Sequence, residues 1–111
     1  MHWIHLTDED QLQKIIVRSQ EKPQVIFKYS TECHLSEIIF QRLQKDCCPE
    51  HVDFHFLDLT IYQNISAKVS ETFRVLPRSP QILLIKEGEC VFESNSEISL
   101  EEIMEHVAAT V

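Results

Sequence analysis

The sequence has a single glycine, Gly88, in 111 residues. Loops that cradle phosphate groups need several glycines for close backbone approach, so nucleotide-binding loops of that kind are nearly excluded. The chain also has only four prolines, and 43% of its residues are hydrophobic. Disordered chains are poor in apolar residues, whereas this composition allows a packed core. We therefore expect one folded domain over residues 1–111.

Long apolar runs and basic clusters are missing as well. The first ten residues have no basic start and no apolar stretch long enough for a signal peptide or a membrane span, which predicts a cytoplasmic location. Eighteen acidic residues outnumber ten basic ones, and no Lys or Arg follows Lys86. The resulting charge of −8 repels phosphate backbones and anionic lipids. The sequence predicts a monomer with an acidic, solvated C-terminal face and with no nucleic-acid or membrane partner.

Hydrophobic periodicity divides the chain into alternating strands and helices. Thr7 follows a short apolar stretch and is expected to cap a helix that Pro23 ends. Ser99 and Glu102 have the spacing of a capping box at the start of a last helix. In chain order we predict a strand at 3–6, a helix ending before 23, a strand at 24–27, a helix over 33–46, a strand at 52–59, a helix around 65–73, a hairpin of strands at 81–86 and 90–92, and a terminal helix with the inner stripe Leu100, Ile103, Met104, Val107 and Val111.

This order of elements is typical of an α/β fold. Parallel βαβ units followed by an antiparallel hairpin make a central mixed sheet with helices on both faces. The tight turn of the hairpin falls at Glu87 and Gly88, where the only glycine supplies the backbone freedom that such a turn needs.

Cys33 lies where a predicted strand gives way to a predicted helix, as the first residue or the cap of that helix. The free amides and positive dipole of a helix start favour a thiolate by ~0.3–1 kcal/mol, or roughly one pKa unit. Glu32 and Glu37 oppose this effect through like charge. Lys28 and His34 are candidates to assist it.

The motif Cys-His-Leu-Ser at 33–36 places a serine where dithiol oxidoreductases carry their second cysteine. Ser36 is one helical turn beyond Cys33, so its hydroxyl can donate a hydrogen bond to the sulfur. A lone thiolate can attack a mixed disulfide and hold the attached group. It cannot release that group by closing an internal disulfide, so an outside thiol must complete the cycle.

A second segment supports this prediction. Ser79-Pro80 directly precedes an apolar strand at 81–86 and a Glu-Gly turn, and this segment resembles the cis-proline loop and hairpin of the thioredoxin superfamily. Within that superfamily, residues 27–36 together with 79–81 most resemble the monothiol bacilliredoxins, and the similarity covers nearly the whole chain. The resemblance implies a thioredoxin-like fold in which the backbone at a cis Pro80 lies beside the sulfur of the motif cysteine.

Members of that family resemble glutaredoxins in function, since they remove the low-molecular-weight thiol bacillithiol from proteins modified by it during oxidative stress. The resemblance implies S-thiolated client proteins as partners and bacillithiol as co-substrate, with no bound cofactor and no metal. Arg78 is a candidate to pair with a carboxylate of the small thiol. The predicted catalytic residues are Cys33 and Ser36, and the predicted substrate-binding residues are His34, Leu35, Arg78, Ser79 and Pro80.

The resemblance also places Phe27 where thioredoxins carry a buried acid that helps to deprotonate their second cysteine. A protein with Ser36 has no second thiol to activate, so a missing acid agrees with monothiol chemistry.

The remaining cysteines are not expected to take part. Cys47 and Cys48 would lie ~21 Å from the motif cysteine along a continuous helix, too far to resolve it. Thiolate and imidazole together are zinc ligands, but His51 and His55 would be ~13 Å apart on an extended strand. We expect structural or solvent-exposed roles for these residues and for Cys90.

A second function class stays open. The usual family motif is Thr-Cys-Pro-Ile-Ser, and this chain departs from it at Glu32, His34 and Leu35. A negative neighbour and a loop without Cys-Pro are compatible with an ordinary thiol, in a non-catalytic thioredoxin-fold interaction module with a vestigial cysteine. A Cys33 pKa near the free value of ~8.5 would favour the module, and a lowered pKa would favour the oxidoreductase.

Overall fold

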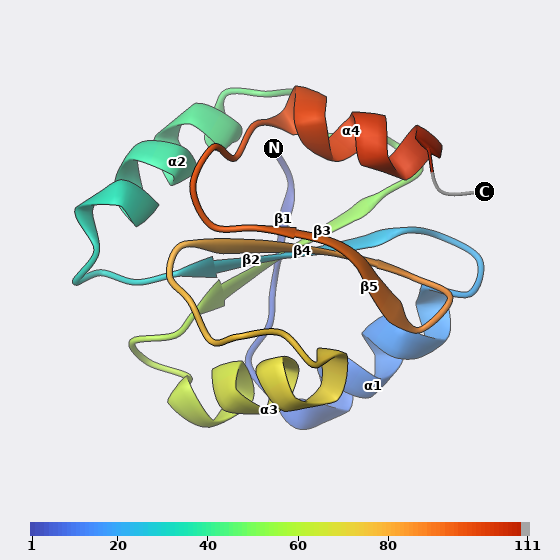
Figure 1. The fold of residues 1–111 in the computed structure, drawn as a ribbon, viewed down its shortest axis with the longest axis horizontal. Coiled ribbons are helices and arrows are strands. Elements are labelled where there is room, and N and C mark those ends of the chain that lie inside the picture. Colours follow the sequence, from blue (N-terminus) through green and yellow to red (C-terminus); the bar gives the residue numbers. More distant parts are fainter. Residues whose placement is uncertain (110–111) are drawn as a thin grey trace.

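The computed structural model describes residues 1–109, which form a five-stranded sheet between two layers of helices (Figure 1). The mixed sheet with helices on both faces that the sequence predicts is therefore confirmed. In chain order the elements are β1 (Trp3–His5), α1 (Glu9–Arg18), β2 (Gln24–Tyr29), α2 (His34–Gln44), β3 (Asp53–Asp58), α3 (Gln63–Phe73), β4 (Gln81–Lys86), β5 (Glu89–Ser94) and α4 (Leu100–Ala109).

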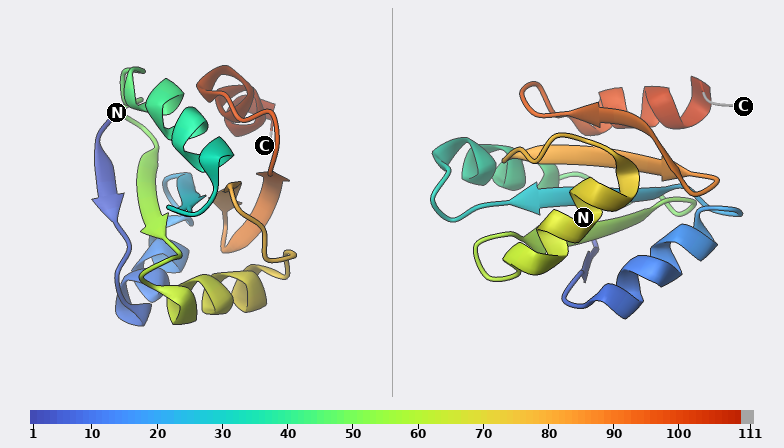
Figure 2. Two further views of the ribbon diagram at one scale, coloured as in Figure 1. Left: turned by 90° about the vertical axis from the view of Figure 1, so that its left-hand side faces the viewer. Right: turned by 60° about the horizontal axis from the view of Figure 1, so that its bottom comes forward.

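The strands lie in the order β1-β3-β2-β4-β5, with β2 in the centre. β3 runs parallel to both β1 and β2, whereas β4 is antiparallel to β2 and β5 is antiparallel to β4. Helices α2 and α4 cover one face of the sheet, and α1 and α3 cover the other (Figures 1 and 2). Because β2 is central and parallel to β3, the loops that follow these two strands meet at the same edge of the sheet.

The sheet separates two hydrophobic clusters. Alternate residues of β2 enter opposite clusters, since successive side chains of a strand point to opposite faces. Val25 and Phe27 pack on the α2 and α4 side, and Ile26 packs on the α1 and α3 side; all three are 0% exposed. Burying side chains of this size contributes about 1.5–3 kcal/mol each. Phe27, at the position of the acid that thioredoxins bury, is thus a core residue.

The first helix begins one residue later than the sequence predicts. Asp8, not Thr7, is the N-cap of α1, and its Oδ1 accepts a hydrogen bond from the Gln11 backbone N–H at 2.8 Å. The Gln11 side chain accepts in return from the Asp8 N–H at 3.1 Å, which completes a capping box. Thr7 instead donates its hydroxyl to the same Gln11 oxygen at 2.9 Å.

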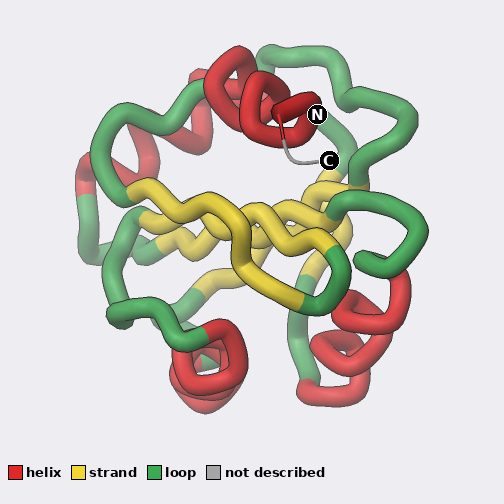
Figure 3. Tube along the Cα trace, turned by 45° about the vertical axis from the view of Figure 1, so that its right-hand side comes forward, coloured by secondary structure: helices red, strands yellow, loops and turns green. Residues whose placement is uncertain are grey.

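The turns and loops gather at the two ends of the sheet (Figure 3). In the hairpin turn, Glu87 has φ 53° and Gly88 has φ 78°, so the only glycine occupies a position that requires a positive φ. At the last helix, the Glu102 N–H donates to Ser99 Oγ at 3.2 Å, which supplies one half of the predicted capping box. Val111 of the predicted inner stripe lies outside the described residues.

Within residues 1–109, no helix has the length and apolar character needed to cross a membrane.

Candidate active site at Cys33

Cys33 is the N-cap of α2, as its place in the sequence predicts. Its backbone is extended, with φ −108° and ψ 109°, and its carbonyl accepts a hydrogen bond from the Ser36 N–H at 3.0 Å. The side chain is half-buried. The thiol therefore lies beside the first amides of a helix, which have no partners within the helix itself.

The loop between α3 and β4 reaches the sulfur from the opposite side. The Ser79–Pro80 peptide is cis, as expected, and Pro80 is buried. The Cys33 thiol donates to the Ser79 carbonyl oxygen, with a distance of 3.6 Å between sulfur and oxygen. A segment 46 residues further along the chain thus forms one wall of the site.

Two serine hydroxyl groups lie next to the sulfur, one from α2 and one from the loop. Ser36 is 0% exposed, and its Oγ lies 3.3 Å from Ser79 Oγ. The Ser30 backbone N–H also donates to Ser36 Oγ, at 3.3 Å. Either hydroxyl can be the donor in the contact between Ser36 and Ser79, so the proton of each serine can also be directed at the Cys33 sulfur.

The pKa of Cys33 is lowered by these hydrogen bonds. The largest contribution is the backbone N–H of Ser36; burial of the sulfur opposes it. The Ser36 hydroxyl, the Leu35 N–H and the Ser79 hydroxyl each lower the pKa further. All of these donors stabilise the thiolate without a charged partner.

The carboxylate of Glu37 is engaged in hydrogen bonds with Tyr29 and Gln41. It accepts from the Tyr29 hydroxyl and, at 2.8 Å, from Gln41 Nε2. The hydrogen bond from Tyr29 is the main reason that the Glu37 pKa is lowered, and the same bond with burial raises the pKa of Tyr29 to about 12. The charges of Glu32 and Glu37, expected to oppose the Cys33 thiolate, are not among the causes of its pKa shift.

The expectation that Lys28 assists the thiolate is wrong. Lys28 is 0% exposed, and its ammonium donates to Ser70 Oγ at 2.7 Å and to the Ser66 carbonyl at 3.2 Å, both on α3. Lys28 alternates with Phe27 along β2, so its side chain enters the α1 and α3 layer. Its burial lowers the pKa of Lys28 to about 8.

The other predicted site residues lie at the surface. His34 and Leu35 follow Cys33 in the first turn of α2, and Leu35 is 42% exposed. Arg78 is exposed on the loop that carries Ser79, and it makes no salt bridge within residues 1–109. The structure therefore brings Cys33, Ser36, Ser79 and Pro80 together and leaves His34, Leu35 and Arg78 open to solvent around them.

The sequence does not predict the contribution of Thr60, which supports the turn before Cys33. Its Oγ1 accepts from the Thr31 N–H at 3.1 Å and lies 3.4 Å from Ser30 Oγ. The Ser30 hydroxyl in turn accepts from the Glu32 N–H at 3.2 Å. Only the parallel pairing of β2 and β3 brings Thr60 to this turn, so no local pattern could have identified it.

The remaining cysteines are free thiols with separate surroundings. Cys47 is exposed, and Cys48 donates to the Pro49 carbonyl at 3.7 Å. Cys90 donates to the Phe92 carbonyl at 3.3 Å, and its burial raises its pKa. Within residues 1–109, no group of three or more His, Cys, Asp or Glu side chains has an arrangement that could hold a metal ion.

The site as built can form and release one mixed disulfide. A half-buried sulfur with a lowered pKa is a nucleophile, and the residue one helical turn away is a serine. Attack on an outside disulfide is thus possible, and closure of an internal Cys33–36 disulfide is not.

Known proteins resemble this chain in sequence and in fold. The sequence model of a family described as monothiol bacilliredoxin BrxC matches residues 4–103. A solved structure described as a candidate oxidoreductase with a thioredoxin fold aligns with a TM-score of 0.80 at 21% identity, over 94% of this chain and 92% of that chain. Thioredoxin Mala s 13 of Malassezia sympodialis aligns with a TM-score of 0.74 at 15% identity, over 100% of this chain and 98% of that chain. These likenesses show the thioredoxin-like fold that the sequence predicts.

Proposed function

Because this chain belongs to the monothiol bacilliredoxin family, we propose that Cys33 removes a low-molecular-weight thiol, bacillithiol, from S-thiolated proteins. The observation that carries the proposal is a single thiol with a lowered pKa, next to Ser36 in place of a second cysteine. A thiol activated by four separate hydrogen-bond donors also supports this function over a non-catalytic interaction module with a vestigial cysteine.

The proposed reaction has two displacement steps. The Cys33 thiolate attacks the bacillithiol sulfur of a protein mixed disulfide, and the client cysteine leaves as a thiolate that takes a proton from solvent. Cys33 is then joined to bacillithiol by a disulfide bond. A second bacillithiol thiolate attacks the bacillithiol sulfur of this adduct, which releases the Cys33 thiolate and bacillithiol disulfide.

The neighbouring residues have distinct roles in the proposal. The hydroxyl groups of Ser36 and Ser79 stabilise the Cys33 thiolate, both before attack and when it leaves in the second step. His34, Leu35 and Pro80 border the attached thiol, and the guanidinium of Arg78 pairs with one of its carboxylates.

A direct test is to incubate the protein with bacillithiol disulfide and to identify adducts by mass spectrometry of the digested chain. We expect one bacillithiol adduct, on Cys33, and none on the Cys33→Ser variant. A client protein carrying bacillithiol should lose it to the wild type in proportion to the adduct formed. An unmodified Cys33 under these conditions would refute the proposal.

The identity of the small thiol needs its own comparison. The same experiment with glutathione disulfide uses a thiol that also carries carboxylates but differs in shape. We expect faster adduct formation with bacillithiol disulfide, and we expect Arg78→Gln to slow it mainly by raising KM. Equal rates with both disulfides would show that the site does not select bacillithiol.

A further inference from the structure

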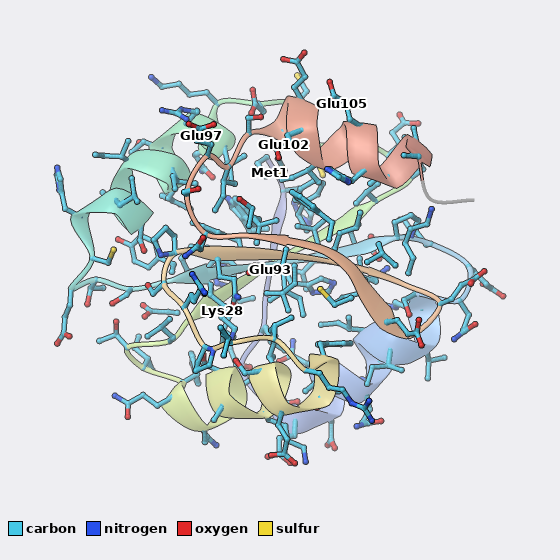
Figure 4. All side chains as sticks on the ribbon, viewed as in Figure 1. Met1, Lys28, Glu93, Glu97, Glu102 and Glu105 are labelled. Atoms are coloured by element: carbon cyan, nitrogen blue, oxygen red, sulfur yellow. The ribbon has the colours of Figure 1, made fainter. Side chains whose placement is uncertain are left out.

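Behind the loop at 74–80, two buried polar side chains have no part in the reaction described above. Lys28 and Gln81 are both 0% exposed, and they are directly opposed on the antiparallel strands β2 and β4. Opposed residues of such a pair project to the same face, with Cβ atoms about 4.5–5.5 Å apart. Figure 4 shows Lys28 on the α3 side of the sheet.

Lys28 bonds to the last turns of α3, just before the loop begins. Its ammonium donates to Ser70 Oγ at 2.7 Å, and the Ser70 carbonyl accepts the N–H groups of Arg74 and Val75, where α3 ends and the loop starts. No carboxylate forms a salt bridge with Lys28 within residues 1–109. A buried ammonium without a counter-ion is costly to the fold, so it is better explained by positioning than by stability.

Gln81 holds the middle of the loop. Its Nε2 donates to the Leu76 carbonyl at 3.0 Å and to Glu93 Oε2 on β5 at 2.7 Å. Gln81 also follows Pro80 directly, so the same residue anchors the end of the loop to β4. Its buried Oε1 has no hydrogen-bond partner among the described residues, and the ammonium of the opposed Lys28 is in the same layer.

We propose that Lys28 and Gln81 act together as positioning residues that fix the loop at 74–80 and so hold Ser79 against the Cys33 sulfur. The inference deepens the proposed function, and it rests on that function for the identity of the reactive thiol. Neither side chain touches the sulfur. Both act through Ser79, whose carbonyl lies 3.6 Å from it.

The test measures the pKa of Cys33 in Lys28→Met, Gln81→Met and the double variant. Iodoacetamide alkylation is followed across pH, with the Cys33 peptide resolved by mass spectrometry. In each single variant we expect the pKa to rise by about half a unit, which makes alkylation at pH 7 about threefold slower. In the double variant we expect less than the sum of the two shifts, because the residues secure one loop.

Gln24→Met is the matched control. Like Gln81, Gln24 is a glutamine of 0% exposure. It lies at the start of β2, far along the strand from Lys28, and its amide donates to the Lys22 carbonyl and to Asp53 Oδ2. We expect it to lower stability and leave the Cys33 pKa unchanged. Ser70→Ala, which removes only the hydroxyl that Lys28 holds, serves as the mild variant if either methionine variant fails to fold, and it should raise the pKa in the same direction.

Two results would overturn the inference. One is an unchanged Cys33 pKa in folded Lys28→Met, Gln81→Met or Ser70→Ala. The other is a shift in Gln24→Met as large as in Gln81→Met, which would indicate a general loss of packing. Alkylation needs no bacillithiol, so a wild type that takes up no bacillithiol would refute the proposed function and leave this result standing.

Discussion

The sulfur of Cys33 is stabilised by donors that belong to two segments. The Ser36 amide and hydroxyl and the Leu35 amide come from the first turn of α2, and the Ser79 hydroxyl comes from the loop before β4. Helix formation alone fixes the first set, whereas the second depends on how the loop docks. The thiolate is therefore sensitive to changes in either segment.

Ser36→Ala should raise the pKa of Cys33 by about half to one unit, because the variant loses one neutral hydrogen bond to the thiolate. The pH profile of iodoacetamide alkylation measures this shift. Ser30→Ala is the control, since the Ser30 hydroxyl contacts the Thr60 hydroxyl and accepts from the Glu32 N–H but does not bond to the sulfur. An equal shift in both variants would show that loss of the turn, and not of the Ser36 hydroxyl, is responsible.

Lys28 should make the protein less stable at neutral pH than the variant Lys28→Met. Its pKa is about 8 when folded and ~10.4 when unfolded, so between these values the unfolded state binds more protons and stability rises with pH. The methionine variant has no titrating group at position 28, so its stability lacks this dependence on pH. We expect the stability gap, from urea unfolding, to be largest at pH 7 and to narrow toward pH 10, and a constant gap would contradict the lowered pKa.

Part of the site could be predicted from residue types and spacing. The motif identifies Cys33 and Ser36, and Ser79-Pro80 before an apolar strand identifies the opposing loop. Lys28 was misplaced because the strand was predicted to end at 27, whereas β2 continues to Tyr29 and its alternation carries Lys28 to the face away from the sulfur. Contacts such as that of Thr60 depend on tertiary structure.

At the scale of elements, the helices were predictable because apolar residues recur at helical spacing, and the central strands β2 and β4 because each is a short apolar run. The ends were less certain, as at α1, where Thr7 and Asp8 are adjacent and both can cap a helix. Here Asp8 Oδ1 caps the helix because the extended backbone of Asp8 directs its side chain to the Gln11 amide.

Asp8→Ala should lower the free energy of unfolding by about 1 kcal/mol through loss of the N-cap. The matched control is Asp10→Ala, which removes an acid from the first turn of α1 but no cap, and it should cost only a few tenths of that amount. Urea denaturation followed by the fluorescence of Trp3 measures both. Equal losses would indicate that helix-dipole attraction, not capping, accounts for the effect of Asp8.

At the scale of the whole molecule, polar groups buried on the α1 and α3 side link β2 to β3 at the end of the sheet away from Cys33. His55 is 3% exposed, and its Nε2 lies 2.8 Å from Gln24 Oε1. Since the amide of Gln24 donates to Lys22 O and Asp53 Oδ2, its oxygen is the acceptor and His55 Nε2 carries the proton. Burial lowers the pKa of His55 to about 4.

The protein should lose stability as the pH falls from 6.5 to 4. In this window the unfolded state binds a proton on His55 and the folded state does not, so stability rises with pH, by up to about 3 kcal/mol in total. Urea unfolding at pH 7 and pH 4.5 measures the loss, and His55→Gln should show a smaller difference. An unchanged difference in this variant would assign acid sensitivity to the carboxylates instead.

The complete burial of Ser36 has a consequence for the proposed adduct between Cys33 and the small thiol. A thiolate displaces a sulfur in line, from the side opposite the bond that breaks. The inner side of the Cys33 sulfur faces protein, since the Ser79 carbonyl oxygen lies 3.6 Å from it and Ser36 is 0% exposed. In the proposed reaction we therefore expect the incoming thiol to attack the outer sulfur of the adduct. That attack regenerates free Cys33, whereas attack on the Cys33 sulfur would only exchange one attached thiol for another.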